Sequence, residues 1–155
     1  MSFDLDRLAE ELQKKIWSQF SDVVIDHANN PRNIGSIEDA DGYASVTGLC
    51  GDTIQIWLKV TDGKIGEITF WTDGCGTTIA AGSMVTELAR GKALPEALQI
   101  TPRDVLDALG GLPEESVHCA FLAANALHEA IKDYRKSQAG HFNGGPQTRS
   151  GAEGK

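Results

Sequence analysis

The stretch Thr53-Ile-Gln-Ile-Trp-Leu-Lys-Val60, followed by Asp62-Gly63 and then by Ile65-Gly-Glu-Ile-Thr-Phe-Trp-Thr72, decides the fold of this chain. Apolar and polar residues alternate along the first segment, which is typical of a strand with one buried face. Asp-Gly is a strong signal for a two-residue hairpin turn. The two segments therefore predict a β-hairpin, and residues 43–47 predict a third strand before it.

Helical patterns lie on both sides of these strands. Their expected bounds are about 3–20, 21–29, 76–91, 101–110 and 116–137. Ser21 and Thr101 are good N-cap residues for two of these helices. The predicted fold is α+β: a small antiparallel three-stranded sheet with helices packed on one side, an N-terminal helix and a flexible C-terminal tail.

The composition predicts one soluble domain. The chain has 155 residues, and its 22 acidic and 14 basic residues give a net charge of −8. This balance argues against nucleic acid or an anionic membrane as a partner, because phosphate is bound through clustered Lys and Arg. No apolar run approaches the roughly 20 residues of a membrane helix. We expect a cytoplasmic protein with a folded domain over residues 1–138 and a disordered tail over 139–155, which is rich in small and polar residues.

Three cysteines stand in polar settings that differ from those of core cysteines. Cys50 lies in Gly-Leu-Cys-Gly-Asp, Cys75 lies in Asp-Gly-Cys-Gly-Thr, and Cys119 follows a histidine. An odd number of cysteines without a secretory signal predicts reduced thiols instead of a disulfide framework. Asp52 and His118 lie beside two of the cysteines. Three thiolates with either neighbour can complete a four-coordinate site for a soft metal.

The predicted elements place the cysteines where they can meet. Cys50 is expected in the turn before the long strand, Cys75 in the turn from strand to helix, and Cys119 in the first turn of the last helix. Element ends at one rim of a sheet can converge, and irregular segments are where ligands usually bind. A helix N-terminus also favours a thiolate over a thiol.

Taken together, the motifs of this chain resemble the IscU/NifU-like iron–sulfur cluster assembly scaffold family. The resemblance runs from about Val24 to Tyr134, and the motifs occur in the family order with family-like separations. In chain order they are Asp-His at 26–27 with Asn-Pro-Arg-Asn-Ile-Gly at 30–35, Cys-Gly-Asp at 50–52, Gly-Cys-Gly at 74–76, and Leu-Pro at 112–113 with His-Cys at 118–119.

The resemblance implies a scaffold and not an enzyme. A cysteine desulfurase would deliver persulfide sulfur, iron would join it, and a [2Fe-2S] cluster would form on Cys50, Cys75 and Cys119 before its transfer to apo iron–sulfur acceptor proteins. Any of the three cysteines could accept the persulfide, and the resemblance favours Cys119. Asp52 and His118 are the alternative fourth ligands, since one weaker ligand favours release of the cluster. The same residues could hold Zn²⁺ when no cluster is bound.

Two other functions are compatible with the same residues: a zinc-bound sulfurtransferase that accepts persulfide from a cysteine desulfurase, and a stable iron–sulfur carrier or redox partner. The segment Leu112-Pro-Glu-Glu-Ser116 differs from the family's LPPVK segment, which argues against recognition by a dedicated Hsp70-type chaperone. Trp17 and Phe20 are either core residues or a docking surface for a partner or a second copy of the chain, which would make a homodimer.

Overall fold

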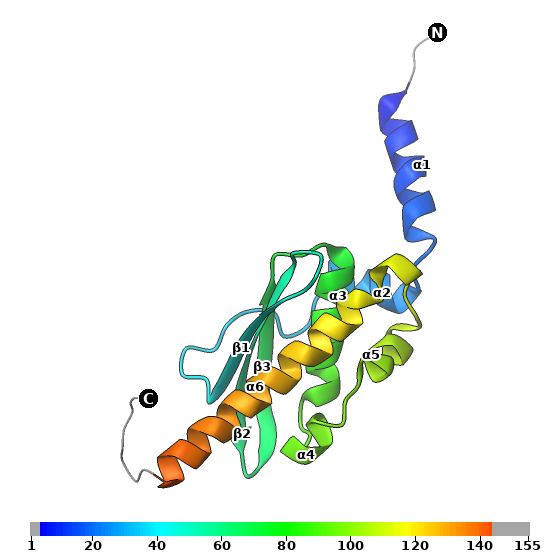
Figure 1. Ribbon diagram of the computed structural model, residues 1–155. Helices are drawn as coiled ribbons and strands as arrows, with labels where there is room; N and C mark the ends of the chain where they lie inside the picture. Colours follow the sequence, from blue (N-terminus) through cyan, green and yellow to red (C-terminus); the bar gives the residue numbers. More distant parts are fainter. Residues whose placement is uncertain (1–3, 144–155) are drawn as a thin grey trace.

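The structure is a computed structural model and describes residues 4–143 (Figure 1). It contains one three-stranded sheet, long helices and two short helical turns. The elements in chain order are α1 (Leu5–Trp17), α2 (Asp22–Asn29), β1 (Gly42–Thr47), β2 (Thr53–Thr61), β3 (Lys64–Thr72), α3 (Gly76–Ala89), α4 (Leu94–Ala97), α5 (Pro102–Leu109), the 3-10 helix η1 (Glu114–Ser116) and α6 (His118–Asn143). The predicted α+β fold is confirmed.

The sheet is an antiparallel meander in the order β1-β2-β3. At the hairpin, Thr61 pairs with Lys64. The two turn residues between them, Asp62 and Gly63, have φ values of 56° and 74°. Positive φ at both positions is the geometry of a type I′ turn, whose twist matches that of the flanking strands. The predicted hairpin is therefore confirmed.

One face of the sheet is buried beneath helices. On β2, Ile54, Ile56 and Leu58 are fully buried, whereas the residues between them are half-buried. Helix α6 packs against β1 and β2, and α3 packs against β3 and α6 (Figure 1). The alternation of the sequence therefore reports the inward and outward faces of the strand, as expected for a sheet with one packed face.

The outer edge of β3 is covered by irregular backbone. Segment 33–35 exchanges two backbone hydrogen bonds of 2.9 Å with Phe70. At the other end of the strand, residues 91–92 make bonds of 2.8 and 2.9 Å with Ile65. A covered edge cannot template pairing with another chain. These contacts join residues far apart in the sequence, and the strand pattern alone did not predict them.

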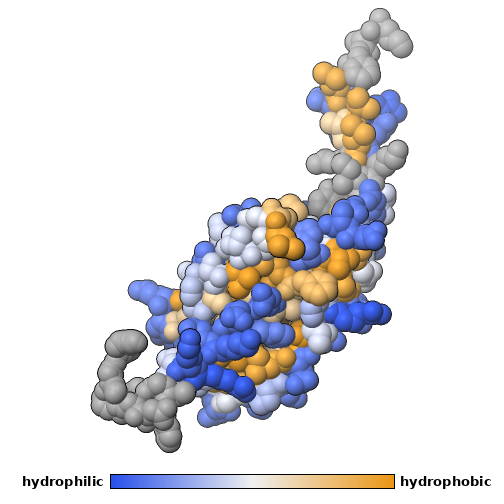
Figure 2. Space-filling view, in the orientation of Figure 1, coloured by the Kyte–Doolittle hydropathy of each residue, from blue (hydrophilic) through white to orange (hydrophobic). Residues whose placement is uncertain are grey.

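Helix α1 forms where the apolar spacing predicts it, but it extends away from the sheet (Figure 1). Leu5 and Leu12 on this helix are 67% and 52% exposed. Apolar atoms are accordingly visible on its described surface in Figure 2. Phe20, after the helix, is partly buried and packs against the core. The side chain of Trp17 lies outside the described residues.

Helix α6 continues to Asn143, six residues beyond its predicted end near Ser137. Elongation adds one hydrogen bond for each residue that is ordered, so a long packed helix readily extends past its last core contact. The remainder of the predicted flexible tail, residues 144–155, lies outside the described residues. Within residues 4–143, no helix has the length and apolar character needed to cross a membrane.

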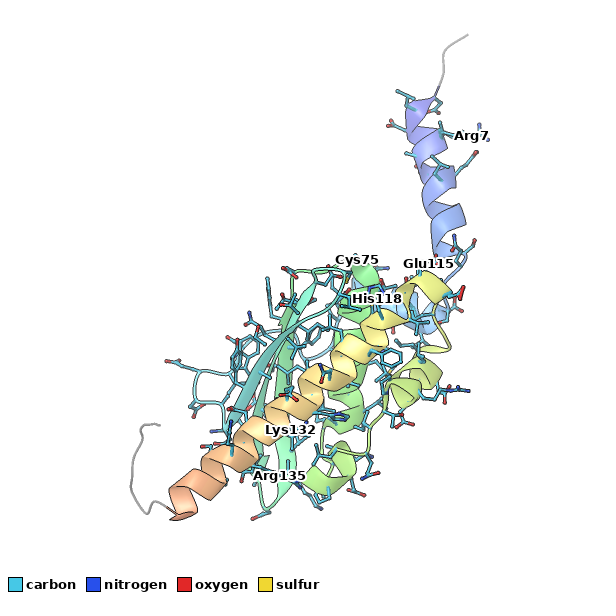
Figure 3. The ribbon with its side chains drawn as sticks, in the orientation of Figure 1. Arg7, Cys75, Glu115, His118, Lys132 and Arg135 are labelled. Carbon is cyan, nitrogen blue, oxygen red and sulfur yellow. The ribbon has the colours of Figure 1, made fainter. Side chains whose placement is uncertain are left out.

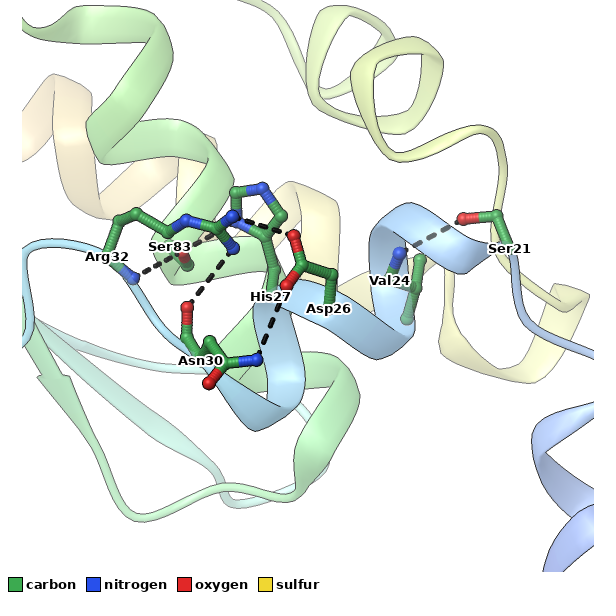
Figure 4. Close-up of polar contacts among 7 residues, drawn as sticks. All are labelled: Ser21, Val24, Asp26, His27, Asn30, Arg32 and Ser83. Atoms are coloured by element: carbon green, nitrogen blue, oxygen red, sulfur yellow. Dashed lines mark hydrogen bonds and ion pairs between the residues drawn. The ribbon is translucent and has the colours of Figure 1, made fainter.

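Hydrogen bonds from the Asp-His motif at 26–27 and the Asn-Pro-Arg-Asn motif at 30–33 hold α2 against α3 (Figure 4). His27 Nδ1 lies 2.7 Å from the Ser83 hydroxyl, which also accepts a bond of 2.9 Å from the backbone N–H of Arg32. The guanidinium of Arg32 pairs with Asp26 at 2.7 Å. His27 and Ser83 are both buried. In this structure the motif therefore holds α3, the helix that follows Cys75, in its place.

We expect acid to destabilise the fold through His27. Burial and then the charge of Arg32 lower the pKa of His27 below its ordinary value of 6.5. Between the folded and unfolded pKa values, the unfolded chain binds a proton that the folded protein does not bind. The contribution of His27 to the free energy of unfolding should therefore be fully present above about pH 6.5. It should be lost as the pH falls through the pKa of His27 in the folded protein.

Denaturant unfolding at about pH 7.5 and about pH 5.5 tests this expectation in the wild type and in His27→Gln. The lower pH is still above the ordinary pKa of aspartate, about 4. The wild type should lose more stability over this interval than the variant. Equal losses in both proteins would contradict the assignment to His27. Between about pH 7.5 and 8.5 the two proteins should show equal slopes, because His27 is neutral in both states there.

Candidate functional site

The topology brings the three cysteine-bearing segments to one end of the sheet. In an antiparallel meander, β1 ends, β2 begins and β3 ends at the same side. Cys50 lies in the loop from β1 to β2, Cys75 is the N-cap residue of α3, and Cys119 is the second residue of α6. Figure 3 labels Cys75 at the start of α3 and His118 at the start of α6. The positions predicted for the three cysteines are confirmed.

Hydrogen bonds fix the turn that carries Cys75. Asp73 accepts a bond of 2.9 Å from the backbone N–H of Thr53, and the Thr72 hydroxyl donates to the Thr53 carbonyl at 2.6 Å. The same hydroxyl accepts a bond of 3.0 Å from the backbone N–H of Gly74. The first residue of β2 therefore holds the end of β3, so the position of Cys75 is set by the sheet.

The loop that carries Cys50 is exposed. The backbone N–H of Gly48 donates to the Asp52 carbonyl at 2.8 Å, and that of Gly51 donates to the Gly48 carbonyl at 3.0 Å. Gly51 has φ +93°, which a residue with a side chain rarely adopts. Cys50 and its neighbour Leu49 both face solvent at the tip. The loop therefore presents its thiol outward, with Asp52 at its base.

Thr78 connects the groups of the site and was not predicted from the sequence. Its hydroxyl donates to Asp52 Oδ2 at 2.8 Å, and lies 3.4 Å from Cys119 Sγ and 3.9 Å from Cys75 Sγ. Thr78 itself is fully buried. A signal was present in the sequence: Cys75 and Thr78 are three residues apart at a helix start, so they share one face of the helix.

Cys75 is the thiol that ionises more readily. It is exposed at the N-terminus of α3, and the Thr77 hydroxyl lies 3.1 Å from its sulfur. Partial burial acts to raise the pKa of Cys75, but hydrogen bonds from the Thr77 hydroxyl and from the backbone N–H groups of Thr78 and Thr77 together lower this pKa below the ordinary value. The expectation of a helix-terminal thiolate therefore holds at Cys75.

The pKa of the Cys119 thiol is shifted in the opposite direction, and its side chain is buried. Its side chain is 1% exposed, and burial, with the charges of the other two cysteines adding to it, raises the pKa of the Cys119 thiol. The position in the first turn of α6 does not overcome this desolvation. His118 is exposed, and its Nε2 lies 3.7 Å from Cys119 Sγ. In this conformation the buried Cys119 thiol therefore loses its proton less readily than the exposed Cys75 thiol.

The predicted site residues are gathered at one end of the molecule but are not arranged as a finished metal site. Contacts through Thr78 join Asp52, Cys75 and Cys119, and His118 contacts Cys119, whereas Cys50 lies on the exposed loop. Among the described residues, no three Cys, His, Asp or Glu side chains are grouped so that they could hold a metal ion. The donor set has the softness that iron and zinc prefer.

Comparisons with known proteins agree with this arrangement. A protein of Archaeoglobus fulgidus named iron-sulfur cluster assembly scaffold protein IscU 1 is 53% identical over 116 residues, which cover 74% of this chain and 76% of that protein. The iron-sulfur cluster assembly scaffold protein IscU of Escherichia coli K12 is 42% identical over 124 residues, which cover 77% of this chain and 96% of that protein.

A solved structure shares the fold. The N-terminal part of a nitrogen-fixing NifU-like protein from Brucella abortus aligns with a TM-score of 0.62 at 20% identity, over 78% of this chain and 97% of that one. At this identity the likeness concerns the fold alone. The sequence model of the NifU-like N-terminal domain matches residues 19–140, which contain all three cysteines. The chain belongs to the NifU-like N-terminal domain family.

Proposed function

We propose that this protein is an iron–sulfur cluster assembly scaffold and not an enzyme. The observation that carries the proposal is that three separate segments place their cysteines at one end of the sheet, in a chain that is 53% identical over 116 residues to a named cluster assembly scaffold. A scaffold needs a site that accepts its cargo and also releases it. An exposed, incompletely assembled set of ligands suits that task better than a closed structural site.

The cargo we propose is a [2Fe-2S] cluster held by Cys50, Cys75 and Cys119. Thiolates are the usual ligands of iron–sulfur clusters. Cys75 is exposed and has a lowered pKa, so it is more ready than the buried Cys119 to bind iron first. The exposed Cys50 loop, with its positive-φ glycine, is the segment that would close over the cargo. Without iron, the same thiols would hold Zn²⁺.

Asp52 and His118 are the two candidates for the fourth ligand, and we favour Asp52. The carboxylate of Asp52 is hydrogen-bonded to the buried Thr78, which also contacts Cys119. By contrast, His118 is an exposed residue that contacts Cys119 at 3.7 Å. The partners we propose are a cysteine desulfurase as sulfur donor and apo iron–sulfur proteins as acceptors. Cys119 remains the predicted persulfide acceptor, and its 1% exposure means that the segments over it must move before a donor reaches it.

Anaerobic reconstitution with ferrous iron, cysteine, a cysteine desulfurase and dithiothreitol, which reduces the persulfide sulfur to sulfide, tests the proposal. The full chain should develop a visible sulfur-to-iron charge-transfer band, and an apo-ferredoxin added afterwards should acquire that band while the chain loses it. A band that stays on the chain would indicate a stable carrier. Tightly held zinc with no band, and persulfide on a cysteine, would indicate a zinc-bound sulfurtransferase instead.

Replacing Asp52 by alanine should lengthen the lifetime of the bound cluster. A carboxylate oxygen is a harder and weaker ligand for cluster iron than a thiolate, so it keeps one position open to exchange. We expect the half-life on the protein, in the presence of apo-ferredoxin, to increase about tenfold, the scale on which partners near a metal site change affinity. Decay of the visible band under argon measures this half-life.

Asp73→Asn is the matched control for this variant. Asp73 is a second acidic residue at the same end of the sheet, and the amide oxygen of asparagine can still accept the bond from the Thr53 backbone. The control removes one negative charge near the cysteines without touching Thr78. Its cluster half-life should equal that of the wild type. An unchanged or shorter half-life in Asp52→Ala would contradict the role given to Asp52.

A further inference from the structure

The hydroxyl of Thr78 is the one polar group that contacts the carboxylate and both helix-borne thiols of the site among the described residues. Thr78 is fully buried in the first turn of α3 and is hydrogen-bonded to Asp52. A buried hydroxyl without partners is costly, so its hydrogen bonds decide where its neighbours rest. The position is therefore suited to control the geometry of the site.

The direction of the hydrogen bonds follows from the chemistry of a hydroxyl. Threonine has one O–H donor and two acceptor lone pairs. Asp52 offers only acceptors when ionised, so the 2.8 Å contact with Asp52 Oδ2 uses the single proton of Thr78. The thiol of Cys119 is then the donor in the 3.4 Å contact. One threonine thus joins the buried thiol to the carboxylate at the base of the Cys50 loop.

The backbone at Gly74 packs closely against this contact. A Cβ atom added at Gly74 would lie 2.7 Å from Asp52 Oδ2, 2.7 Å from Thr78 Cβ and 2.8 Å from Thr78 Oγ1. Real Cβ contacts are not this short, so only glycine fits between the two side chains. The turn before Cys75 therefore closes directly over the contact between Asp52 and Thr78.

We propose that Thr78 is a positioning residue that holds the Asp52 carboxylate beside Cys119 and so sets how readily the cluster is released. The inference rests on the proposed function, since it assigns a partner to the carboxylate that promotes release. Thr78 does not ligate iron. It acts through Asp52, whose carboxylate would turn toward solvent without the 2.8 Å bond and leave the cluster held by thiolates alone.

Two substitutions test the hydroxyl separately from the shape of the side chain. Thr78→Val keeps the volume and removes the hydrogen bonds, whereas Thr78→Ser keeps the hydroxyl and removes a methyl group. Thr78→Val should lengthen the half-life of the cluster toward that of Asp52→Ala, about tenfold. Thr78→Ser should restore the wild-type half-life. A wild-type half-life in Thr78→Val, or failure of serine to restore it, would overturn the inference.

A double substitution tests whether Thr78 acts through Asp52. Adding Thr78→Val to Asp52→Ala should produce no further change in half-life, because residues that act through one interaction are not additive. An additive effect would overturn the inference. Thr86→Val is the matched control: Thr86 is also fully buried on α3, and its hydroxyl donates to the Ser83 carbonyl at 2.8 Å. This control should keep the wild-type half-life even where it lowers stability.

A measurement on the cluster-free protein separates this inference from the proposed function. The ¹³C resonance of the Asp52 carboxylate should shift in Thr78→Val, return in Thr78→Ser and remain unchanged in Thr86→Val. No shift in Thr78→Val would overturn the positioning role, whatever the cluster assays show. If the wild type assembles no cluster, the proposed function fails, and the proposed effect of Thr78 on cluster release fails with it. A shifted Asp52 resonance in Thr78→Val would still show that Thr78 positions the Asp52 carboxylate.

Discussion

Cys75→Ser is expected to leave the protein folded but unable to hold an iron–sulfur cluster. Cys75 is the N-cap residue of α3, a position whose side chain can accept hydrogen bonds from the backbone N–H groups of the first turn. Serine is a preferred N-cap residue, so the free energy of unfolding should be equal to or slightly above that of the wild type. The serine hydroxyl is hard and stays protonated near neutral pH, so it replaces a thiolate ligand poorly.

We expect cluster affinity to fall by more than about a hundredfold in Cys75→Ser. Loss of a residue that only hydrogen-bonds to a metal ligand lowers metal affinity by about 10–100-fold, and loss of the ligand itself should cost more. The visible band after reconstitution measures this loss, and the denaturant midpoint of the cluster-free protein measures folding. Cys119→Ser is the informative comparison. It should lose the cluster as well, but it should also lose stability, because Cys119 is buried against the core and serine places a more polar group there. A band of wild-type intensity in Cys75→Ser would remove Cys75 from the ligand set.

Phe70→Ala should have the largest effect on stability. Phe70 is fully buried on β3, and its backbone pairs with segment 33–35 while its ring packs on Gly82 of α3. Truncation of a buried phenylalanine costs about 3–5 kcal/mol, through lost burial and the cavity that remains. Domains of this kind have total stabilities of only about 5–15 kcal/mol. The variant should therefore unfold at much lower denaturant concentration than the wild type.

A double-substitution cycle with Gly82→Ala checks the cause. A Cβ atom at Gly82 would lie 2.6 Å from Cδ2 and Cε2 of Phe70, so Gly82→Ala alone should cost about 1–3 kcal/mol through overpacking. In the Phe70→Ala background the ring is absent. The same alanine should then be neutral or stabilise α3 by up to about 1 kcal/mol. Denaturant unfolding of the four proteins measures the coupling, and additive costs would contradict a direct contact between the ring and Gly82.

Most of the sheet could be predicted from local sequence because each strand and its turn carry their own signals. The alternation around Ile56 and the Asp-Gly turn predict the hairpin, and the structure confirms both. The cover over the edge of β3 could not be predicted, because it depends on backbone pairing between segment 33–35 and Phe70. The direction of α1, which extends away from the sheet, could not be predicted either. An amphipathic pattern shows which face of a helix is apolar but not what covers that face.

The candidate site was predicted in its chemistry but not in its electrostatics. The sequence alone determined that Cys50, Cys75 and Cys119 lie at element ends, because glycines, turns and caps are local signals. Only the tertiary structure decided that Cys75 is exposed with a lowered pKa and that Cys119 is buried with a raised one. It also placed Thr78 between them. Burial and hydrogen bonding across segments arise when distant parts of the chain pack together, and no local pattern reports them.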